Sequence, residues 1–168
     1  MIEVIRAQTG PQVDAVRSLM RAFVAWHRER HLADRQLIDD YFSAGDFEQE
    51  LASLPGKYSP PGGRLLLASS DGEYAGCVAL RALDEQTCEM KRMFVYPRFQ
   101  GRRVGRTLAE VVIQEARAIG YASMLLDTSV RQAEAIGLYE SLGFVRIEPY
   151  YELPDALKSW LVFMRLEL

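Results

Sequence analysis

The sequence predicts a single α/β domain over residues 1–168, with a mixed, mostly antiparallel sheet and helices on both of its faces. Three strand-like segments follow one another between residues 64 and 95, and helical and strand-like segments alternate after them. Consecutive strands pair as an antiparallel meander, whereas a right-handed strand, helix, strand crossover adds a parallel strand. With 168 residues, 49% of them hydrophobic, the chain is long enough to bury one core.

The N-terminal part contains a short strand and two helical regions. Residues 2–7 form the strand, and Thr9 is the predicted N-cap of a helix with apolar residues at helical spacing. These apolar residues are Val13, Val16, Leu19, Phe23 and Trp26. A second, less regular helical region covers residues 39–54 and ends at Pro55 and Gly56.

The meander comprises residues 64–68, 73–83 and 87–95. Asp71 and Gly72 join its first two segments, and this dipeptide suits the positive backbone angles of a tight hairpin turn. In the register that the second turn implies, Cys77 faces Met93. Cys77 and Cys88 are then too far apart along the ladder to form a disulfide.

The second half of the chain alternates helices and strands. A helix is predicted from Arg103 to Gly120, because apolar residues recur there at the helical period and glycine commonly ends a helix. Residues 123–128 form a buried strand, and a shorter helix that carries Leu138 and Tyr139 ends at Gly143. The last two strands are residues 144–148 and 160–166.

Composition and charge exclude several classes of function. The net charge of −3 and the pI of about 5.5 provide no basic excess for nucleic acid. No segment approaches the roughly 18 apolar residues of a membrane span, and the N-terminus does not resemble a signal peptide. We therefore expect a cytoplasmic protein that binds neither nucleic acid nor a membrane. His27 and His31 have no third ligand at metal-binding spacing, so we expect no metal and interpret both as surface residues.

One segment is basic, although the chain as a whole has a negative net charge. Between Met90 and Ala109 there is no Asp or Glu, while six residues are basic: Lys91, Arg92, Arg98, Arg102, Arg103 and Arg106. Glycines surround the start of the predicted helix here, and a helix N-terminus offers unpaired N–H groups and about half a positive charge to a phosphate. The alternative is an ordinary Gly-rich turn with solvated arginines. Neither a nucleoside-triphosphate loop nor a three-glycine dinucleotide fingerprint is present.

A resemblance to a known family covers the same segment. Its residues are Gln100, Gly101, Arg102, Arg103, Val104 and Gly105. They resemble the acyl-CoA signature of the GCN5-related N-acetyltransferase (GNAT) superfamily, with a departure at Arg103, where the pattern has Gly. Residues 138–144, LYESLGF, are similar to the second signature of the family. The order of elements agrees as well, so the resemblance spans nearly the whole chain and implies the GNAT fold, acetyl-CoA as co-substrate and N-acetyl transfer.

The resemblance also implies roles for particular residues. The cofactor-binding residues would be Met93, Phe94 and Val95 through their main chain, then Gln100, Gly101, Arg102, Arg103, Val104, Gly105 and Arg106, and finally Gln132, where many members carry Asn. Tyr139 would donate a proton to the leaving thiolate, and Glu89 would be the general base that deprotonates the amine. The alternatives are core packing for Tyr139 and a solvated strand end for Glu89.

The resemblance places the acceptor at residues 27–57 and 150–159. Acidic residues in these segments favour a cationic acceptor, unless they are solvated surface, and they include Asp39, Asp40, Asp46, Glu48, Glu50, Glu152 and Asp155. The leading hypothesis is direct transfer, in a ternary complex, to the primary amine of a small molecule. A protein or peptide N-acetyltransferase and a non-catalytic acyl-CoA-binding module are the alternatives. A homodimer is possible, since aromatic residues could line a pocket, a dimer interface or the core: Phe23, Trp26, Tyr150, Tyr151 and Trp160.

Overall fold

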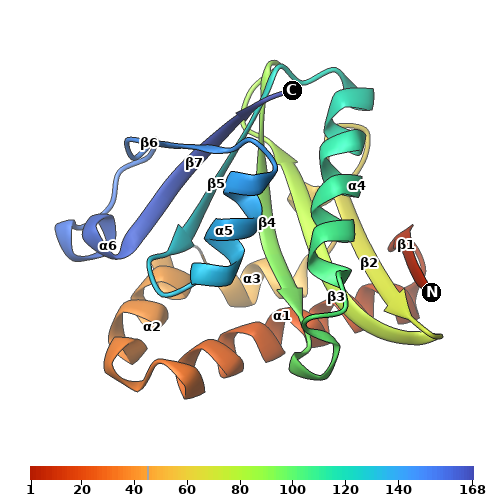
Figure 1. Ribbon diagram of the computed structural model, residues 1–168, viewed down its shortest axis with the longest axis horizontal. Coiled ribbons are helices and arrows are strands. Elements are labelled where there is room, and N and C mark those ends of the chain that lie inside the picture. Colours follow the sequence, from red (N-terminus) through yellow and green to blue (C-terminus); the bar gives the residue numbers. More distant parts are fainter. Residues whose placement is uncertain (45) are drawn as a thin grey trace.

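A seven-stranded sheet in the order β1-β2-β3-β4-β5-β7-β6 forms the centre of the molecule (Figure 1). The computed structural model describes residues 1–44 and 46–168. Neighbouring strands are antiparallel except β4 and β5, which run parallel on either side of a helical crossover. The predicted fold class, a mixed and mostly antiparallel sheet covered by helices, is confirmed.

The strands are β1 (Ile2–Arg6), β2 (Arg64–Ser70), β3 (Glu73–Ala82), β4 (Thr87–Val95), β5 (Ser123–Ser129), β6 (Val145–Ile147) and β7 (Leu161–Glu167). The helices are α1 (Gly10–Arg30), α2 (Arg35–Ala44), α3 (Phe47–Ala52), α4 (Val104–Ile119), α5 (Ala133–Ser141) and α6 (Asp155–Trp160). The helical region expected at residues 39–54 is thus divided between α2 and α3, and α6 lies in a segment where no helix was predicted.

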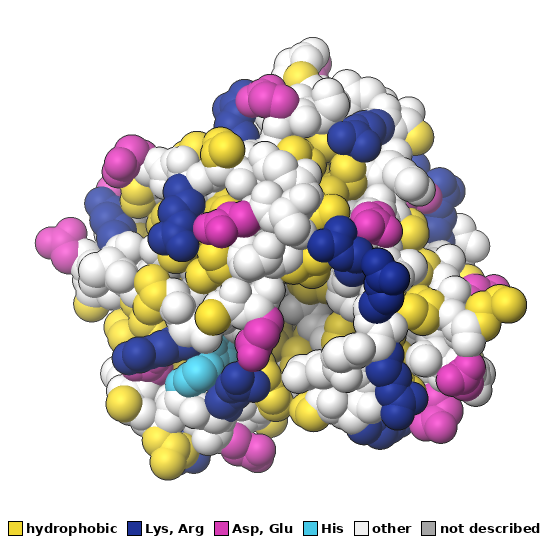
Figure 2. Space-filling view, in the orientation of Figure 1, with side chains coloured by type: hydrophobic (Ala, Val, Ile, Leu, Met, Phe, Trp, Pro, Cys, Tyr) yellow, Lys and Arg dark blue, Asp and Glu magenta, His cyan; other side chains and the backbone are white. Residues whose placement is uncertain are grey.

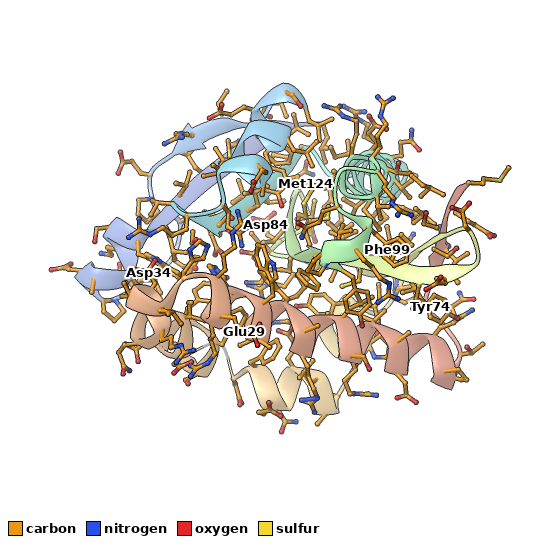
Figure 3. The ribbon with its side chains drawn as sticks, turned by 60° about the horizontal axis from the view of Figure 1, so that its bottom comes forward. Glu29, Asp34, Tyr74, Asp84, Phe99 and Met124 are labelled. Atoms are coloured by element: carbon orange, nitrogen blue, oxygen red, sulfur yellow. The ribbon has the colours of Figure 1, made fainter. Side chains whose placement is uncertain are left out.

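The helices cover opposite faces of the sheet (Figures 1 and 3). On one face, Leu108 and Val112 of α4 pack with Leu126 of β5. On the other, Leu19 of α1 and Leu51 of α3 belong to a second core. Both cores consist of fully or nearly fully buried apolar side chains, which the hydrophobic effect stabilises in proportion to the area removed from water.

Two local features predicted from the sequence, the N-cap of α1 and the turn between β2 and β3, have the expected hydrogen bonds and backbone angles. The Thr9 side chain accepts a hydrogen bond from the Gln12 backbone, and the Gln12 side chain accepts one from the Thr9 backbone, which completes a capping box at the start of α1. Asp71 and Gly72 both have positive φ, 51° and 86°, as a tight turn between β2 and β3 requires.

A β-bulge interrupts β4 opposite β3. The register changes from Ala79↔Lys91 to Cys77↔Phe94, so Arg92 and Met93 together occupy the place of one residue. The predicted pairing of Cys77 with Met93 is therefore wrong by one residue. Arg92 has φ 60°, which is unusual for a residue with a Cβ atom.

The parallel pairing of β4 with β5 is short. It ends at Glu89↔Leu125, and beyond this pair the two strands diverge. A gap between strands exposes backbone groups and side chains that a continuous ladder would cover. This divergence, next to the bulge, positions the site described below.

Within the described part of the chain, no helix is both long and apolar enough to cross a bilayer. The same residues contain no group of three His, Cys, Asp or Glu side chains arranged to share a metal ion.

Candidate active site

A cleft of about 510 Å³ lies between the end of β4 and the first turns of α4 and α5. Ten of the eleven predicted cofactor-binding residues line it: Met93, Phe94, Val95, Gln100, Gly101, Arg103, Val104, Gly105, Arg106 and Gln132. Arg102 is the exception. The structure thus brings together residues that the sequence separates by up to 39 positions, since β4, α4 and α5 converge here. That these residues bind a ligand stays a prediction.

The start of α4 has the geometry of an anion site. The first backbone hydrogen bond at this end runs from the Thr107 N–H to the Arg103 carbonyl, 3.0 Å apart. Val104, Gly105 and Arg106 therefore have N–H groups with no acceptor inside the helix. Gly101 has φ 78°, a backbone angle that glycine adopts without strain. These N–H groups and the helix dipole suit a diphosphate.

The end of β4 presents its backbone to the same cleft. The Tyr96 N–H donates to the Ala75 carbonyl of β3, and hydrogen bonds alternate in direction along an antiparallel pair. Val95 therefore directs its N–H and carbonyl away from β3. The Gln100 side-chain amide donates to the Val95 carbonyl at 3.1 Å, so this side chain joins the loop to the strand. The Val95 N–H is left to face the cleft.

The arginines of this segment differ in what they contact. The Arg106 guanidinium donates to the Ser141 hydroxyl at 2.8 Å and lies 3.4 Å from a Glu110 oxygen. Arg102 lies over the ring of Phe99, with 5.6 Å between its Cζ atom and the ring centroid. Figure 2 shows Lys and Arg side chains beside the hollow near the lower end of α4. Even where they contact protein groups, these cations make the cleft favourable for a polyanion.

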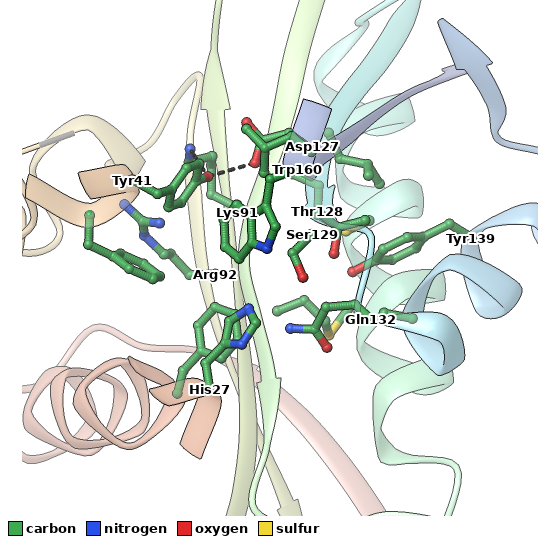
Figure 4. Close-up of a pocket in the computed structure, with 17 residues that line it drawn as sticks. His27, Tyr41, Lys91, Arg92, Asp127, Thr128, Ser129, Gln132, Tyr139 and Trp160 are labelled. Carbon is green, nitrogen blue, oxygen red and sulfur yellow. Dashed lines mark hydrogen bonds between the residues drawn. The ribbon is translucent and has the colours of Figure 1, made fainter. Parts of the chain in front are cut away.

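A smaller cavity of about 70 Å³ adjoins the cleft where β4 and β5 diverge (Figure 4). Five residues line both spaces: Phe23, Met93, Gln132, Ala135 and Tyr139. Figure 4 shows Tyr139 and Gln132 on one side of the cavity, with Tyr41 and Arg92 on the other. The cleft and the cavity therefore form one continuous site.

Tyr139 lies at the junction of the two spaces. Its ring packs against Phe144 with the centroids 5.7 Å apart, and only 5% of the residue is exposed. Burial, and then the charge of Asp127, raise the pKa of its hydroxyl, so the group stays protonated in neutral solution. The described residues provide this hydroxyl with no hydrogen-bond partner. Core packing and a proton-donor role are therefore compatible for this side chain.

Glu89 has an environment that the sequence did not predict. Its interpretation as a solvated strand end is wrong, because the residue is 1% exposed. Its carboxylate accepts hydrogen bonds from Arg81 Nε at 2.7 Å and from the Tyr150 hydroxyl at 2.5 Å. Burial opposes ionisation, but Lys91, Tyr150 and Arg81 outweigh it and lower the pKa of Glu89. The side chain lines neither the cleft nor the cavity, so a proton from the site reaches it only through a relay.

The polar residues at the far side of the cavity were not predicted. Asp127 of β5 accepts hydrogen bonds from the hydroxyls of Tyr41 at 2.6 Å and Tyr151 at 2.5 Å. Lys91 of β4 lies with its Nζ atom 3.4 Å from the Tyr41 oxygen. The available signal was the presence of Glu89, Lys91 and Arg92 in the strand predicted at residues 87–95 and of Asp127 in the next strand, because buried charges are rare and commonly serve binding or catalysis.

The structure also corrects the expected position of His27. It was expected at the surface, but it is 3% exposed, lines the cavity and stacks on Trp160 with 5.7 Å between ring centroids. Burial, followed by the charge of His31, lowers the pKa of His27 to about 4. The imidazole is therefore neutral at physiological pH, and its Nδ1 atom has no hydrogen-bond partner among the described residues.

The acidic residues expected at the acceptor site do not line the cavity. Asp39 is paired with Arg28, and Glu50 with Arg92. From the predicted acceptor segments, the cavity contains only His27, Tyr41 and Phe42. The remaining acidic side chains of these segments belong to ion pairs or to the solvated surface, as the alternative interpretation stated.

Sequence comparison assigns most of the chain to one family. Residues 20–144 match the sequence model of the "Acetyltransferase (GNAT) family". The chain is 41% identical over 123 residues to an "Uncharacterized N-acetyltransferase" of Schizosaccharomyces pombe, covering 72% of this chain and 74% of the relative. It is 36% identical over 164 residues to "IAA acetyltransferase" of Azospirillum brasilense, covering 96% and 97% of the two chains.

Solved structures with the same fold include an acetyltransferase from Streptococcus agalactiae, with a TM-score of 0.74 and 21% identity over 99% of this chain and 98% of the other. A PaiA N-acetyltransferase from Thermoplasma acidophilum in complex with coenzyme A has a TM-score of 0.73 at 15% identity, covering 100% and 99%. Residues 20–144, which match the family model, include the residues that line the cleft, the start of α4 and Tyr139. The chain therefore belongs to the acetyltransferase (GNAT) family and is an acetyl-CoA-dependent N-acetyltransferase.

Proposed function

We propose that this enzyme acetylates the primary amine of a small molecule, by direct attack of the amine within a ternary complex. The supporting observation is the shape of the site, in which a small cavity of about 70 Å³ opens on the cleft at Tyr139. A polypeptide acceptor needs a groove along which its chain can lie, whereas a small cavity suits a metabolite.

The names of two relatives agree with a small acceptor. One is the Azospirillum brasilense "IAA acetyltransferase". The other is human "N-acetylaspartate synthetase", which is 33% identical over 134 residues, covering 77% of this chain and 44% of that protein. Both are named for small molecules. Identities of this size do not transfer a particular substrate, so the proposal is limited to the class.

The cleft residues would hold acetyl-CoA, which supplies the activated acetyl group. The unpaired N–H groups of Val104, Gly105 and Arg106 would bind its diphosphate. The backbone N–H of Val95 faces the cleft, where it can donate to the pantetheine arm or to an oxygen that gains negative charge during transfer. The departure from the family pattern at Arg103 does not remove this site, because Arg103 itself adopts φ 68°.

Two proton transfers complete the proposed reaction. An alkyl ammonium has a pKa near ~10.4, so the acceptor must lose a proton before it attacks. Glu89 stays the candidate base, through a relay that includes Tyr150, the hydroxyl that it binds, and a bridging water, because Tyr150 does not line the cavity either. Tyr139 would donate its proton to the departing sulfur, and its raised pKa keeps that proton in place beforehand.

The experiment that tests the acceptor class is a thiol-release assay with acetyl-CoA. The panel contains amino acids, polyamines and simple alkyl amines, together with unstructured peptides that carry free N-termini and lysines. We expect turnover with at least one small amine and a kcat/KM for it above that of every peptide. Turnover with peptides alone would overturn the small-molecule proposal. Binding of acetyl-CoA without turnover of any acceptor would instead favour the non-catalytic binding module.

A further inference from the structure

Lys91 is the cation of this site that has no carboxylate partner. Its side chain lines the cavity, and its Nζ atom has one hydrogen-bond contact among the described residues, the Tyr41 hydroxyl at 3.4 Å. No carboxylate oxygen of the described chain lies within 4.0 Å of this nitrogen. A largely buried ammonium is costly unless it is paired. The position of Lys91 therefore calls for an anion that the chain itself does not supply.

The neighbouring ion pairs leave Lys91 without a direct carboxylate contact. The four cations of this region are Lys57, Arg81, Lys91 and Arg92, and the three carboxylates are Glu50, Glu89 and Asp127. Glu50 binds both Arg92 and Lys57, at 2.8 and 3.0 Å, and Glu89 binds Arg81 at 2.7 Å. Asp127 is the remaining carboxylate, and among the described residues it reaches Lys91 only across the Tyr41 hydroxyl.

Asp127 does not satisfy Lys91 by direct contact. Its two oxygens accept the hydroxyl hydrogens of Tyr41 and Tyr151, and Lys91 reaches only the Tyr41 oxygen. These hydrogen bonds occupy both oxygens of Asp127 and orient its carboxylate toward the two tyrosines. The remaining directions around the Lys91 ammonium include the cavity, where a substrate group can approach.

We infer that the acceptor carries a carboxylate as well as its amine, and that Lys91 binds this carboxylate in the cavity. The acceptor class is then an amino acid or a similar amino-carboxylate, and not a polyamine. This inference rests on the proposed small-molecule function. It assigns Lys91 a role in specificity, since it contacts a part of the acceptor that does not react.

The arrangement of the walls is consistent with such an acceptor. The cavity meets the cleft at Tyr139 and Met93, and Lys91 lies beyond them along β4, next to Tyr41. An amino-carboxylate bound to Lys91 directs its other end toward the junction where the acetyl group would lie. The uncharged His27 and the ring of Phe42 also line the cavity, and the charge of Arg92, another lining residue, is paired with Glu50.

The experiment compares acceptors that differ only in the carboxylate. Amino acids are assayed beside their own amides in the thiol-release assay, with wild type, Lys91→Met and Lys57→Met. Lys57 is the matched control, because it belongs to the same charge cluster but does not line the cavity. In wild type we expect kcat/KM for the preferred acid to exceed that for its amide by about 10-fold or more. Lys91→Met should raise KM for the acid by a similar factor and leave KM for the amide unchanged, whereas Lys57→Met should preserve the preference.

The outcomes separate this inference from the proposed function. Equal efficiency with acids and amides, or an unchanged KM for the acid in Lys91→Met, would overturn the role of Lys91 while small-molecule acetylation stands. A preference for polyamines would do the same. Turnover of peptides alone would overturn the proposed function, and this inference with it. The acid-to-amide comparison in wild type needs no variant, so it tests the acceptor class even if Lys91→Met fails to fold.

Discussion

Arg92 donates two hydrogen bonds to Glu50, at 2.8 Å from Nε and 3.0 Å from Nη2, and so ties the bulge of β4 to α3. Both residues are 7% exposed. The guanidinium also lies over the rings of Phe42 and Phe47, with distances of 5.2 and 5.1 Å to their centroids. Since Arg92 has a positive φ, this ion pair helps to maintain the backbone geometry on which the divergence of β4 and β5 depends.

We predict that Glu50→Gln lowers the free energy of unfolding at pH 7 by about 3 kcal/mol. Burial by itself would raise the pKa of Glu50, but hydrogen bonds and charge interactions with Arg92 and Lys57 outweigh it and lower the pKa from 4.5 to about 2. The variant leaves Arg92 buried without its anionic partner. Urea unfolding of the two proteins, followed by circular dichroism, gives the difference.

The pH dependence of this effect has a definite sign. A carboxyl whose pKa is lower in the folded state stabilises the fold above its unfolded value. The contribution of Glu50 is therefore complete above pH 4.5 and falls as the pH drops toward about 2. The stability difference between wild type and Glu50→Gln should shrink over this interval. Glu48→Gln is the control, because Glu48 is exposed and lies 3.5 Å from Arg21 in a solvated pair. A constant difference from pH 7 to pH 3 would contradict the assigned role.

Several elements could be predicted from sequence because their causes are local. The strand predicted at residues 87–95 has the bounds of β4, since the segment follows a turn and Pro97 comes two residues after its end. Thr9, Asp71 and Gly72 act through their own backbone neighbourhood, and each has the expected role. The assembly of the cleft was predictable for another reason, because two signature segments of a known family carried it.

The rest depended on contacts between distant segments. The bulge at Arg92 has no glycine to mark it, and Glu50, which stabilises it, lies 42 residues away. Tyr41 and Asp127 are 86 residues apart, so no local pattern indicates that they meet. His27 was expected at the surface, and a solvated strand end was the alternative for Glu89, but partners or aromatic neighbours from other elements bury both residues.

We predict that Gly105→Pro weakens acetyl-CoA binding by about 10-fold or more, while Gly105→Ala changes it little. Proline removes one N–H from the start of α4, and its ring occupies the space in front of that group. Pro11 in the first turn of α1 shows that this chain accepts proline there. A Cβ at Gly105 would meet Val95 and Leu138 side-chain atoms only at 3.8 and 3.9 Å, so alanine fits. Isothermal titration calorimetry measures both affinities, and equal affinities would argue against an anion site at this helix end.

We predict that Tyr139→Phe lowers kcat on the order of 10²-fold or more and preserves the fold. The variant removes the hydroxyl at the junction of the cleft and the cavity but keeps the ring that packs on Phe144. Tyr121→Phe is the matched control, because its hydroxyl donates to the Gly62 carbonyl away from the site. It should lower stability by about 1 kcal/mol and leave kcat unchanged. An unaltered kcat in the purified Tyr139→Phe enzyme would remove the proton-donor assignment.

The last prediction concerns the general base. If Glu89 accepts the proton of the amine through Tyr150, then Glu89→Gln and Tyr150→Phe each interrupt the relay, and we expect each to lower kcat on the order of 10²-fold. The pKa of Glu89 is held below its usual range, so the carboxylate is ionised at neutral pH. The kcat of the wild-type enzyme should therefore not fall through protonation of Glu89 as the pH is lowered from 8 to 6.

A control variant distinguishes this relay from a structural ion pair. Arg81→Gln also breaks the contact of Arg81 with Glu89 but retains both the carboxylate and its Tyr150 partner. It should reduce stability while kcat stays within a few-fold of wild type. A loss of stability without a loss of kcat in all three variants would assign Glu89 to the support of β4, and the amine would then lose its proton to solvent or to a residue that lines the cavity.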